Sequence, residues 1–345
     1  MKTVCFTSFS LGYLSRARLL ADSVKRGHPD WQMVALLVDA LPPTDNAFTP
    51  FDGVIQAAAL QIPDFPAWIF KHDLVEACTA VKAPMLQALL QSGADRVIYL
   101  DPDIAVFHPL EAILQALDTN SIILTPHQST PSTSETAIRD NELTTLQYGI
   151  YNLGFVAVRN DTPGNAFAAW WTDMTRRACY DDVPNGIFTD QKYCDLVPGL
   201  FEGVRIERDP GCNVASWNLE SRPLAFDTEG NLTAAGEPLK FYHFSKIGGI
   251  GDTMTARYAS EGTEVFEIVN WYKRRLKDFT IPSVSKIAWR YGFFDNAIPI
   301  PRDARLLWRD RPDLRVAFPN PFAAHGDSFL AWLRSNHPSM IQGQI

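Results

Sequence analysis

The sequence predicts an α/β fold in which helices flank a mostly parallel, doubly wound central sheet. Short β-prone runs alternate with helically spaced stretches from the start of the chain, which is the pattern of βαβ units. Residues 96–100 are almost wholly apolar, as in a strand that is buried on both faces. Polar clusters follow strand-like runs at Asp39, at Asp101 and Asp103, and after residue 243. Because ligands bind beyond the carboxyl ends of such strands, we expect one shared cleft.

The expected elements follow from periodicity and from breaking residues. Segment 127–147 has no clear periodicity and is rich in Ser, Thr and charge, so we interpret it as a functional loop or lid. Between about 180 and 240 the chain is irregular and broken by prolines. The spacing predicts strands at 3–9, 33–38, 96–100, 121–125, 150–158 and 240–244, and helices at 15–26, 74–91, 109–118, 164–179, 261–278 and 325–335.

The composition is that of an ordinary globular protein. The chain has 345 residues, of which 46% are hydrophobic and 20% charged, and its net charge is −8. A general nucleic-acid binder needs a basic surface, so that class is disfavoured. Residues 240–345 nevertheless carry 15 basic and 10 acidic side chains. The length and this change in charge suggest one large domain, at 1–250, followed by a basic, aromatic-rich and mainly helical extension, at 251–345.

The sequence predicts a cytoplasmic protein. No apolar run approaches the length needed to span a bilayer, and polar residues and Gly interrupt the first apolar stretch, unlike a signal peptide. The five cysteines are scattered and lack CxxC spacing. We therefore expect reduced, mostly buried thiols rather than a disulfide framework or a zinc site.

The most informative motif is Asp101-Pro102-Asp103. Two carboxylates two residues apart at the exit of a buried strand offer hard oxygen ligands that suit Mg²⁺ or Mn²⁺. Such spacing is common, and a solvated turn is the plain alternative. Apolar residues on both sides favour the metal, because unpaired carboxylates against a core are unfavourable.

Around this motif the sequence resembles the nucleotide-sugar-dependent glycosyltransferases of the GT-A fold, which is Rossmann-like. The similarity is greatest to the retaining, glycogenin-like and lipooligosaccharide galactosyltransferase enzymes, so the resemblance implies a retaining mechanism. It implies a nucleotide-sugar-binding half at about 1–125 and an acceptor and donor-sugar half at about 126–250. The motifs that carry it run in order from residue 3 to about 250: FTSFSLGYLSRARLLADSVKRGHPDWQMVALLVD, CTAVKAPML, VIYLDPDIAVF, YNLGFVAVRN, FTDQKYCDLVP, PGCNVASWNL and YHFSKIGG.

For the nucleotide, the resemblance implies roles for residues at the ends of the first strands. Thr7, Ser8 and Asp39 match positions that hold the base and ribose, although Asp39 fits the cap of a strand or turn equally well. Lys82 matches the basic residue that faces the nucleotide or its phosphates, with an exposed helix lysine as the alternative. Asp101 would lie near the ribose as well as bind the metal.

For the metal and the diphosphate, the resemblance implies roles for Asp103, His243 and the loop that follows. His243 matches a late histidine that completes the metal shell, although a lone His in an aromatic strand is more often a core residue. Lys246 would meet the leaving diphosphate, and Gly248 would allow close backbone approach to phosphate. The chain departs from the family pattern here, since it lacks the Lys-Pro-Trp that follows in relatives.

For the donor sugar and the reacting face, the resemblance implies Asn152, Gly154, Asp190 and Gln191. Asn152 can hydrogen-bond sugar hydroxyls, and Gly154 would leave room for a ring. Asp190 would bind donor-sugar hydroxyls, and Gln191 would lie near the anomeric carbon. Thr189 followed by this pair also reads as the beginning of a helix, and both interpretations can hold together.

The expected function is metal-dependent transfer of a sugar from a UDP-sugar to a saccharide or lipid-linked acceptor, in cell-surface polysaccharide or lipopolysaccharide synthesis. A sugar nucleotidyltransferase is the main alternative, but the turn at 9–14 has one glycine where that class has a glycine-rich loop. A non-catalytic sugar-binding protein is the other. The basic, aromatic-rich extension suggests peripheral contact with an anionic membrane, or else a helical subdomain with solvated cations.

Overall fold

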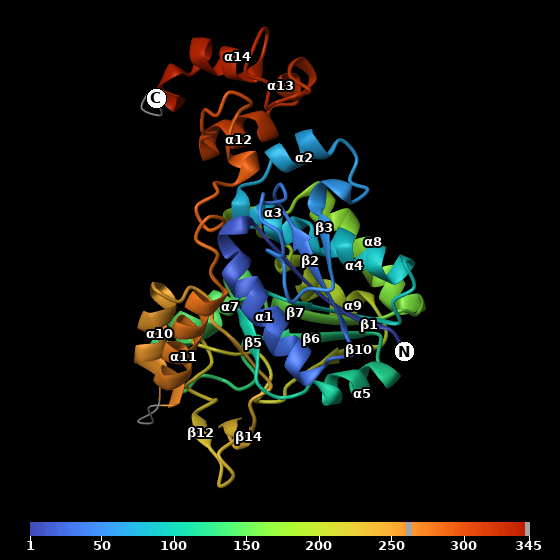
Figure 1. Ribbon diagram of the computed structural model, residues 1–345, viewed down its shortest axis with the longest axis vertical. Coiled ribbons are helices and arrows are strands. Elements are labelled where there is room, and N and C mark those ends of the chain that lie inside the picture. The colour runs from blue at the N-terminus through green and yellow to red at the C-terminus, as the bar shows by residue number, and fades with distance from the viewer. Residues whose placement is uncertain (260–263, 342–345) are drawn as a thin grey trace.

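A seven-stranded mixed sheet forms the centre of the protein. The computed structural model describes residues 1–259 and 264–341. The strand order is β10-β6-β7-β4-β1-β2-β3, and β7 is antiparallel to both of its neighbours while the remaining pairs are parallel (Figure 1). The predicted mostly parallel α/β core is confirmed. The strands are β1 Thr3–Phe9, β2 Gln32–Leu37, β3 Gly53–Gln56, β4 Arg96–Leu100, β6 Ile122–Pro126, β7 Tyr151–Arg159 and β10 Val204–Ile206.

Helices cover both faces of this sheet, because successive strand residues point to opposite sides. Val4, Val97 and Tyr99 lie in the core shared with α4 and α8, whereas Cys5 and Ile98 lie in the core shared with α1 and α5. The helices are α1 Leu14–Gly27, α3 Leu74–Ala80, α4 Lys82–Gln91, α5 Glu111–Thr119 and α8 Thr162–Arg177. Tyr99 and the residue two places on, Asp101, therefore start on the α4 side of the sheet.

The single helix predicted at 74–91 is two helices, so that prediction is wrong in detail. α3 begins with a capping box formed by Asp73 and Glu76, and α4 starts anew at Lys82. Pro84 explains the break: it has no N–H to donate to a carbonyl one turn earlier, and it is tolerated only in the first turn of a helix. The restart places Lys82 at the first position of α4.

Segment 127–147, which we interpreted as a functional loop or lid because it lacks clear periodicity, is partly helical. Its second half is helical through α6 Glu135–Ala137, a π-helical stretch Ile138–Leu143 and α7 Thr144–Tyr148. The Ser134 hydroxyl accepts a hydrogen bond from the Ala137 N–H at 3.1 Å and caps the segment, and Gly149, with a φ of 127°, follows its end. Ser134, a residue type that favours the N-cap of a helix, was the overlooked signal for the beginning of this helical segment. A role for the segment as a lid stays a prediction.

A small second sheet places the late strand beside the motif at 101–103. Its order is β11-β15-β5, with β5 Ile104–Val106 antiparallel to β15 Phe241–His243, so that His243 is opposite Ile104. α1 supports β5 from behind, since the Ser23 hydroxyl accepts a hydrogen bond from the Val106 N–H at 3.0 Å. The other short elements are β8 Asp181–Asp182, β9 Ile187–Phe188, α9 Val197–Leu200, β11 Val214–Ala215, β12 Leu224–Phe226, β13 Leu232–Ala234 and β14 Glu237–Pro238.

The C-terminal part is helical, as expected, and it packs onto the sheet domain at two places. α10 and α11 lie beside β5, while α12 to α14 form a lobe next to α2 (Figure 1). The lobe shares one hydrophobic core with α2, α3 and α4, to which it contributes Trp308 and Phe329. Within the described part of the chain, no helix combines the length and apolarity that crossing a bilayer requires. These elements are α2 Phe65–Phe70, α10 Ile250–Tyr258, α11 Glu264–Phe279, α12 Arg302–Asp310, α13 Pro312–Ala317 and α14 Phe329–Asn336. Residues 261–263 of the predicted helix at 261–278 lie outside the described residues.

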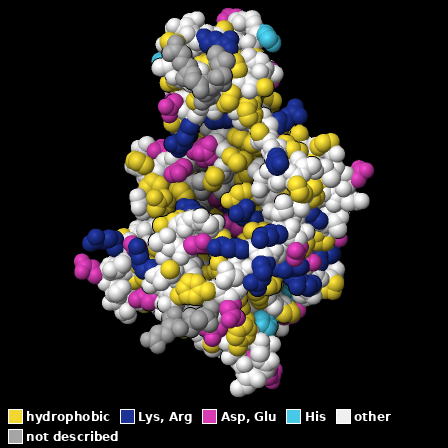
Figure 2. Space-filling model, turned by 60° about the vertical axis from the view of Figure 1, so that its left-hand side comes forward, with side chains coloured by type: hydrophobic (Ala, Val, Ile, Leu, Met, Phe, Trp, Pro, Cys, Tyr) yellow, Lys and Arg dark blue, Asp and Glu magenta, His cyan; other side chains and the backbone are white. Residues whose placement is uncertain are grey.

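Several cations of this part are engaged within the protein. Arg305 is buried, Arg309 stacks on Tyr180 at 4.0 Å from the ring centroid, and Arg275 pairs with Asp278 at 2.9 Å. This agrees with a helical subdomain packed on the core, and membrane contact stays a prediction. Across the molecule, Lys and Arg side chains gather in the middle of one face, below the C-terminal lobe (Figure 2).

The contact between Ser23 and Val106 provides a test of how β5 is held. Ser23→Ala leaves the buried Val106 N–H without its acceptor, so we expect the free energy of unfolding to fall by roughly 1–3 kcal/mol. Urea unfolding measures this change. Ser335→Ala, which removes an exposed hydroxyl, is the control and should stay within about 0.5 kcal/mol. Equal stability of the two variants would show that β5 does not depend on this hydrogen bond.

Candidate metal and nucleotide-sugar site

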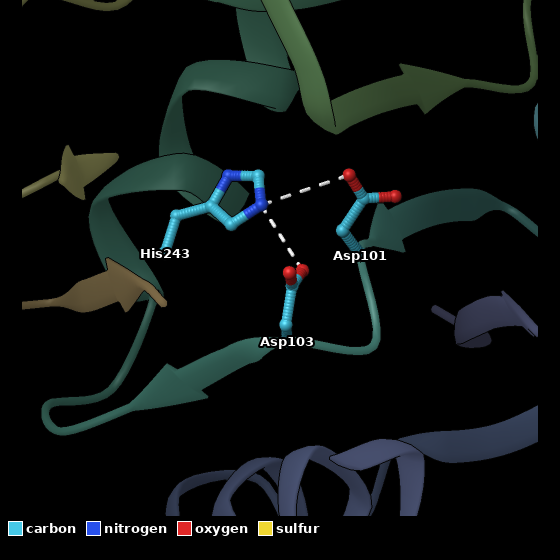
Figure 3. Close-up of side chains that lie close together, drawn as sticks. All are labelled: Asp101, Asp103 and His243. Atoms are coloured by element: carbon cyan, nitrogen blue, oxygen red, sulfur yellow. Dashed lines mark ion pairs between the residues drawn. The ribbon is translucent and has the colours of Figure 1, made fainter. Parts of the chain in front are cut away.

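Two carboxylates and one imidazole converge where β4 ends. The Nε2 atom of His243 lies 3.0 Å from Asp103 Oδ1 and 3.8 Å from Asp101 Oδ2 (Figure 3). One ligand atom from each of the three residues lies within 4.8 Å of the others. The predicted grouping of these residues is present in the structure, and the set can hold a metal ion.

Backbone hydrogen bonds of three different strands build this cluster. The Ile104 N–H donates to the Asp101 carbonyl at 3.0 Å, which closes a turn around Pro102. The Asp101 N–H donates to the carbonyl of Gly154 on β7 at 2.8 Å, and the Phe244 N–H donates to the carbonyl of Asp103 at 2.8 Å. The turn is therefore tied on one side to β7 and on the other to the end of β15.

The donor set fits a divalent cation of the Mg²⁺ or Mn²⁺ type, which prefers carboxylate oxygens and accepts imidazole nitrogen. Asn152 Oδ1 lies 3.2 Å from His243 Nδ1. Because an amide oxygen only accepts, Nδ1 carries the proton and Nε2 is turned toward the carboxylates, as in metal-bound histidines. Without a cation, burial opposes charge on both side chains, but their mutual attraction lowers the pKa of Asp103 and raises the pKa of His243.

Lys82 is buried in the site and joins two of its carboxylates. Its Nζ lies 3.2 Å from Asp101 Oδ1 and 3.3 Å from Asp190 Oδ2, and it donates to the carbonyl of Leu153 at 3.0 Å. Burial alone would lower the pKa of Lys82, but Asp101 and Asp190 raise it above the usual value. Lys82 is thus a charged part of the site and not an exposed helix lysine.

Asp190 and Gln191 are brought to the same place but have different contacts. Burial raises the pKa of Asp190, while Lys82 opposes this. The Gln191 side chain bridges two backbone segments: its Oε1 accepts from the Leu153 N–H at 3.2 Å, and its Nε2 donates to the Tyr148 carbonyl at 3.1 Å. In this structure the Gln191 side chain links β7 to α7. Its expected place near the anomeric carbon stays a prediction.

Asn152 and Gly154 serve the histidine side of the cluster. The Asn152 amide lies between His243 and His127, whose Nε2 is 3.2 Å from Asn152 Nδ2. A Cβ on Gly154 would lie 2.6 Å from His243 Cε1 and 2.7 Å from Asn152 Oδ1. The space beside Gly154, expected to admit a sugar ring, is occupied by the imidazole of His243.

Tyr99 is a site residue that the sequence analysis missed. Its hydroxyl donates to Asp101 Oδ1 at 2.5 Å and lies 3.1 Å from Ser8 Oγ. The Ser8 hydroxyl donates in turn to the carbonyl of Cys78 at 2.6 Å. Since both hydroxyl protons are donated elsewhere, Ser8 contacts Tyr99 without a hydrogen bond to it in this structure. The signal was a phenol within an otherwise apolar strand, two residues before Asp101 and so on the same face.

Arg16 is a second side chain that the sequence analysis did not single out. Ser23 of α1 contacts Val106, and Leu19 lies in the same core as Ala105. Arg16 lies seven residues before Ser23 in α1, and Asp103 lies three residues before Val106. Both stretches are about 10 Å long, so Arg16 lies next to Asp103. Its charge helps to lower the pKa of Asp103. Its guanidinium stacks on Tyr13 at 4.5 Å from the ring centroid, and no carboxylate of the described residues forms an ion pair with it.

The nucleotide residues predicted at the ends of β1 and β2 are buried. The hydroxyl of Thr7 has no hydrogen-bond partner among the described residues. Asp39 Oδ1 accepts from the N–H groups of Ala40 at 3.0 Å and Arg290 at 3.1 Å, while Oδ2 accepts only from Leu11 at 3.5 Å. Burial raises the pKa of Asp39 and these hydrogen bonds oppose the rise. These contacts are those of a cap at the end of β2, and Oδ2 can still accept, so a role of Asp39 in binding the nucleotide stays a prediction.

Lys246 and Gly248 follow β15 on an exposed loop. Both have a positive φ, of 54° and 89°. None of the hydrogen bonds or ion pairs between described residues connects the Lys246 side chain to Asp101, Asp103 or His243. The structure therefore leaves the predicted contact of this loop with a diphosphate untested.

No protein family model matches the chain. Among curated proteins it is similar to YfnF of Bacillus subtilis (strain 168), at 30% identity over 177 residues that make up 50% of this chain and 57% of YfnF. It is also similar to YfnD of the same organism, at 25% identity over 226 residues, 63% of this chain and 68% of YfnD. Both relatives are named as uncharacterized proteins. The match thus spans little more than half the length of YfnF.

Among solved structures, the chain is similar to the galactosyltransferase LgtC in complex with donor and acceptor sugar analogs. The identity is 14%, the match covers 81% of this chain and 97% of that one, and the TM-score is 0.48. For the glycosyltransferase GlyE of Streptococcus pneumoniae TIGR4 the identity is 14%, the coverage 85% and 66%, and the TM-score 0.42. For mouse xyloside xylosyltransferase 1 the identity is 14%, the match covers 71% of this chain and 98% of that one, and the TM-score is 0.41. By name, these proteins are glycosyltransferases.

Gly154 provides a test of the cluster. A methyl group at this position displaces the His243 imidazole, so we expect Gly154→Ala to weaken Mn²⁺ binding at least about tenfold, since metal ligands and their supports each contribute on this scale. Titration calorimetry with MnCl₂ measures the affinity. Gly53→Ala is the control, because a Cβ there meets nothing within 4 Å. Mn²⁺ binding that is as tight in Gly154→Ala as in this control would contradict the proposed cluster.

His127 provides a test by pH. Burial lowers its pKa to about 4, below the value of about 6.5 in unfolded chains. Between these two values the unfolded chain binds more protons, so this group makes stability fall as pH is lowered from about 6.5 to about 4. We expect His127→Gln to show a shallower fall over this range than the wild-type protein. Urea unfolding at a series of pH values measures both slopes, and parallel slopes would show that His127 is protonated equally in both states.

Proposed function

We propose that the protein is a GT-A glycosyltransferase that moves a sugar from a nucleotide-diphosphate sugar, with a UDP-sugar as the expected donor, to a saccharide or lipid-linked acceptor. The observation that carries the proposal is the convergence of Asp101, Asp103 and His243 at the carboxyl end of a central strand. The sequence resemblance supplies the reaction class. Synthesis of cell-surface polysaccharide or lipopolysaccharide, at the cytoplasmic face of the membrane, is part of the proposal.

The proposed reaction builds negative charge on the departing nucleoside diphosphate. A divalent cation, when bound by Asp101, Asp103 and His243, would supply the electrostatic stabilisation that this charge needs. Arg16 next to Asp103 adds a cation that is free of carboxylate partners in the described part of the chain, and Lys246 is the second candidate from the sequence. Lys82 cannot serve this purpose in the same way, because Asp101 and Asp190 already neutralise it.

The proposed stereochemistry is retention. The bond between the anomeric carbon and the diphosphate oxygen breaks, the acceptor oxygen forms its bond on the same face, and the acceptor proton passes to the leaving diphosphate. Asp190 would hold donor-sugar hydroxyls, as its burial beside Lys82 keeps its carboxylate in one place. Asn152 and Gln191 act as positioning residues through His243 and β7, respectively.

A screen of nucleotide sugars tests this function. Thermal unfolding is measured with UDP-, GDP- and dTDP-sugars, each with MnCl₂ and with EDTA. A ligand at 100 times its dissociation constant adds about 2.7 kcal/mol of stability. Metal-dependent stabilisation together with slow donor hydrolysis supports a transferase. Stabilisation without any turnover favours a sugar-binding protein, and release of pyrophosphate from a sugar phosphate and a nucleoside triphosphate favours a nucleotidyltransferase.

Asp103→Asn tests the metal requirement directly. The amide keeps the size of the side chain but removes the charge that a cation needs, so we expect the fold to persist and Mn²⁺-dependent turnover to fall by at least about a hundredfold. Donor hydrolysis and circular dichroism measure the two effects. Asp173→Asn on the surface of α8, which loses a pair with Arg177, is the matched control. Full wild-type activity in EDTA would exclude this mechanism.

A further inference from the structure

The C-terminal part of the chain crosses the carboxyl end of β2. The Trp289 indole N–H donates to the carbonyl of Val38 at 2.8 Å, and the Arg290 N–H donates to Asp39 Oδ1 at 3.1 Å. These are contacts over about 250 positions of sequence, made by residues that precede the C-terminal lobe. They lie at the edge of the sheet where the sequence resemblance implies the nucleoside end of the donor.

The two carboxylate oxygens of Asp39 differ in how many hydrogen bonds they accept. Oδ1 accepts from the N–H groups of Ala40 and Arg290, at 3.0 and 3.1 Å. Among the residues that the structure describes, Oδ2 has a single long contact, with the Leu11 N–H at 3.5 Å. Since each carboxylate oxygen accepts about two hydrogen bonds, the orientation of the group is held through Oδ1 while Oδ2 keeps capacity for a hydroxyl donor.

The segment Trp289–Tyr291 is itself held in place by a buried cation. Arg305 of α12 lies between aromatic rings, at 5.2 Å from the Phe70 centroid and 5.3 Å from the Trp289 centroid. Its guanidinium donates to the Phe70 carbonyl at 3.1 Å and to the Tyr291 carbonyl. Because Phe70 belongs to α2 and Arg305 to the lobe, the lobe and the sheet domain fix this segment together.

Arg290 is the one residue of the segment that is exposed. Burial raises the pKa of Asp39, and the positive charge of Arg290 partly opposes this rise. No carboxylate of the described residues forms an ion pair with the Arg290 guanidinium. It therefore stands at the rim beside Asp39 as a cation available to an anionic ligand. Its neighbours Trp289 and Tyr291 are half-buried, with ring centroids 5.9 Å apart.

We infer that the C-terminal extension completes the nucleoside end of the donor site. The N–H groups of Trp289 and Arg290 hold the end of β2 so that Asp39 Oδ2 accepts from a ribose hydroxyl, and the Arg290 guanidinium attracts the nucleotide at the rim. This rests on the proposed function. It assigns the extension a role in binding a nucleoside diphosphate, as a structural part of the site.

Two variants at one position separate the backbone hydrogen bond from the side-chain charge. Arg290→Ala removes the guanidinium and keeps the N–H, whereas Arg290→Pro removes both. Proline suits this position, because Trp289 before it is extended, with φ −59° and ψ 122°, and Arg290 opens a 3₁₀ turn, Arg290–Gly292. Lys286→Ala, which removes an exposed cation four residues before Arg290, is the charge control.

The readout is the affinity for UDP with MnCl₂, compared with the affinity for inorganic pyrophosphate with MnCl₂. We expect Arg290→Ala to weaken UDP binding several-fold, and Arg290→Pro to weaken it about tenfold more, the scale of one hydrogen bond to a charged group. Pyrophosphate has no ribose, so its affinity should be the same in Arg290→Ala and Arg290→Pro. Lys286→Ala should bind UDP like the wild-type protein.

Equal UDP affinity of Arg290→Ala and Arg290→Pro overturns the inference and leaves the proposed function standing. Failure of the wild-type protein to bind UDP, GDP or dTDP with Mn²⁺ overturns the proposed function and this inference with it. If Arg290→Pro does not fold, Trp289→Phe replaces it, because it keeps an aromatic ring for Arg305 and loses the N–H to Val38 together with the second ring of the indole. Unchanged UDP affinity in Trp289→Phe then overturns the inference.

Discussion

The burial of several charges at one end of a central strand is the constraint on which this structure depends. Asp101, Asp103 and Asp190 lie together, with Lys82 as a fully buried counter-charge and His243 as the third ligand group. Carboxylates in such a place are unfavourable unless cations or hydrogen bonds compensate them. Lys82 compensates Asp101 and Asp190, which leaves Asp103 and His243 as the side where a divalent cation could add positive charge.

Several residues around the cluster hold these charged side chains in position. Tyr99 fixes one oxygen of Asp101, and Asn152 sets the tautomer of His243. Gly154 is small because the imidazole packs where a Cβ would be. Such supporting groups touch no reacting atom, but they determine whether the ligand atoms stand at the distances that a metal needs.

The C-terminal extension belongs to the same arrangement. Its lobe shares a hydrophobic core with α2, α3 and α4, and its leading segment contacts the end of β2 through Trp289 and Arg290. The arginines that suggested a membrane surface include two, Arg305 and Arg309, that pack against aromatic rings inside the protein. A boundary near residue 250 therefore separates two stretches of sequence that share one core.

The sequence by itself determined the α/β fold, most strand and helix positions and the pair Asp101 and Asp103, because period, apolar runs and motif spacing are local properties. The resemblance to a known family, and not spacing, pointed to His243. Three further features had local signals that were overlooked: Pro84 inside the helix at 74–91, Ser134 before the helical residues 135–148, and Tyr99 two residues before Asp101. The sequence could not reveal that Arg16 joins the site. Nor could it reveal that Gly154 makes room for His243, or that Arg290 contacts Asp39. Only tertiary structure decides these contacts, because they join residues that the chain order holds far apart and that packing alone brings within hydrogen-bond distance.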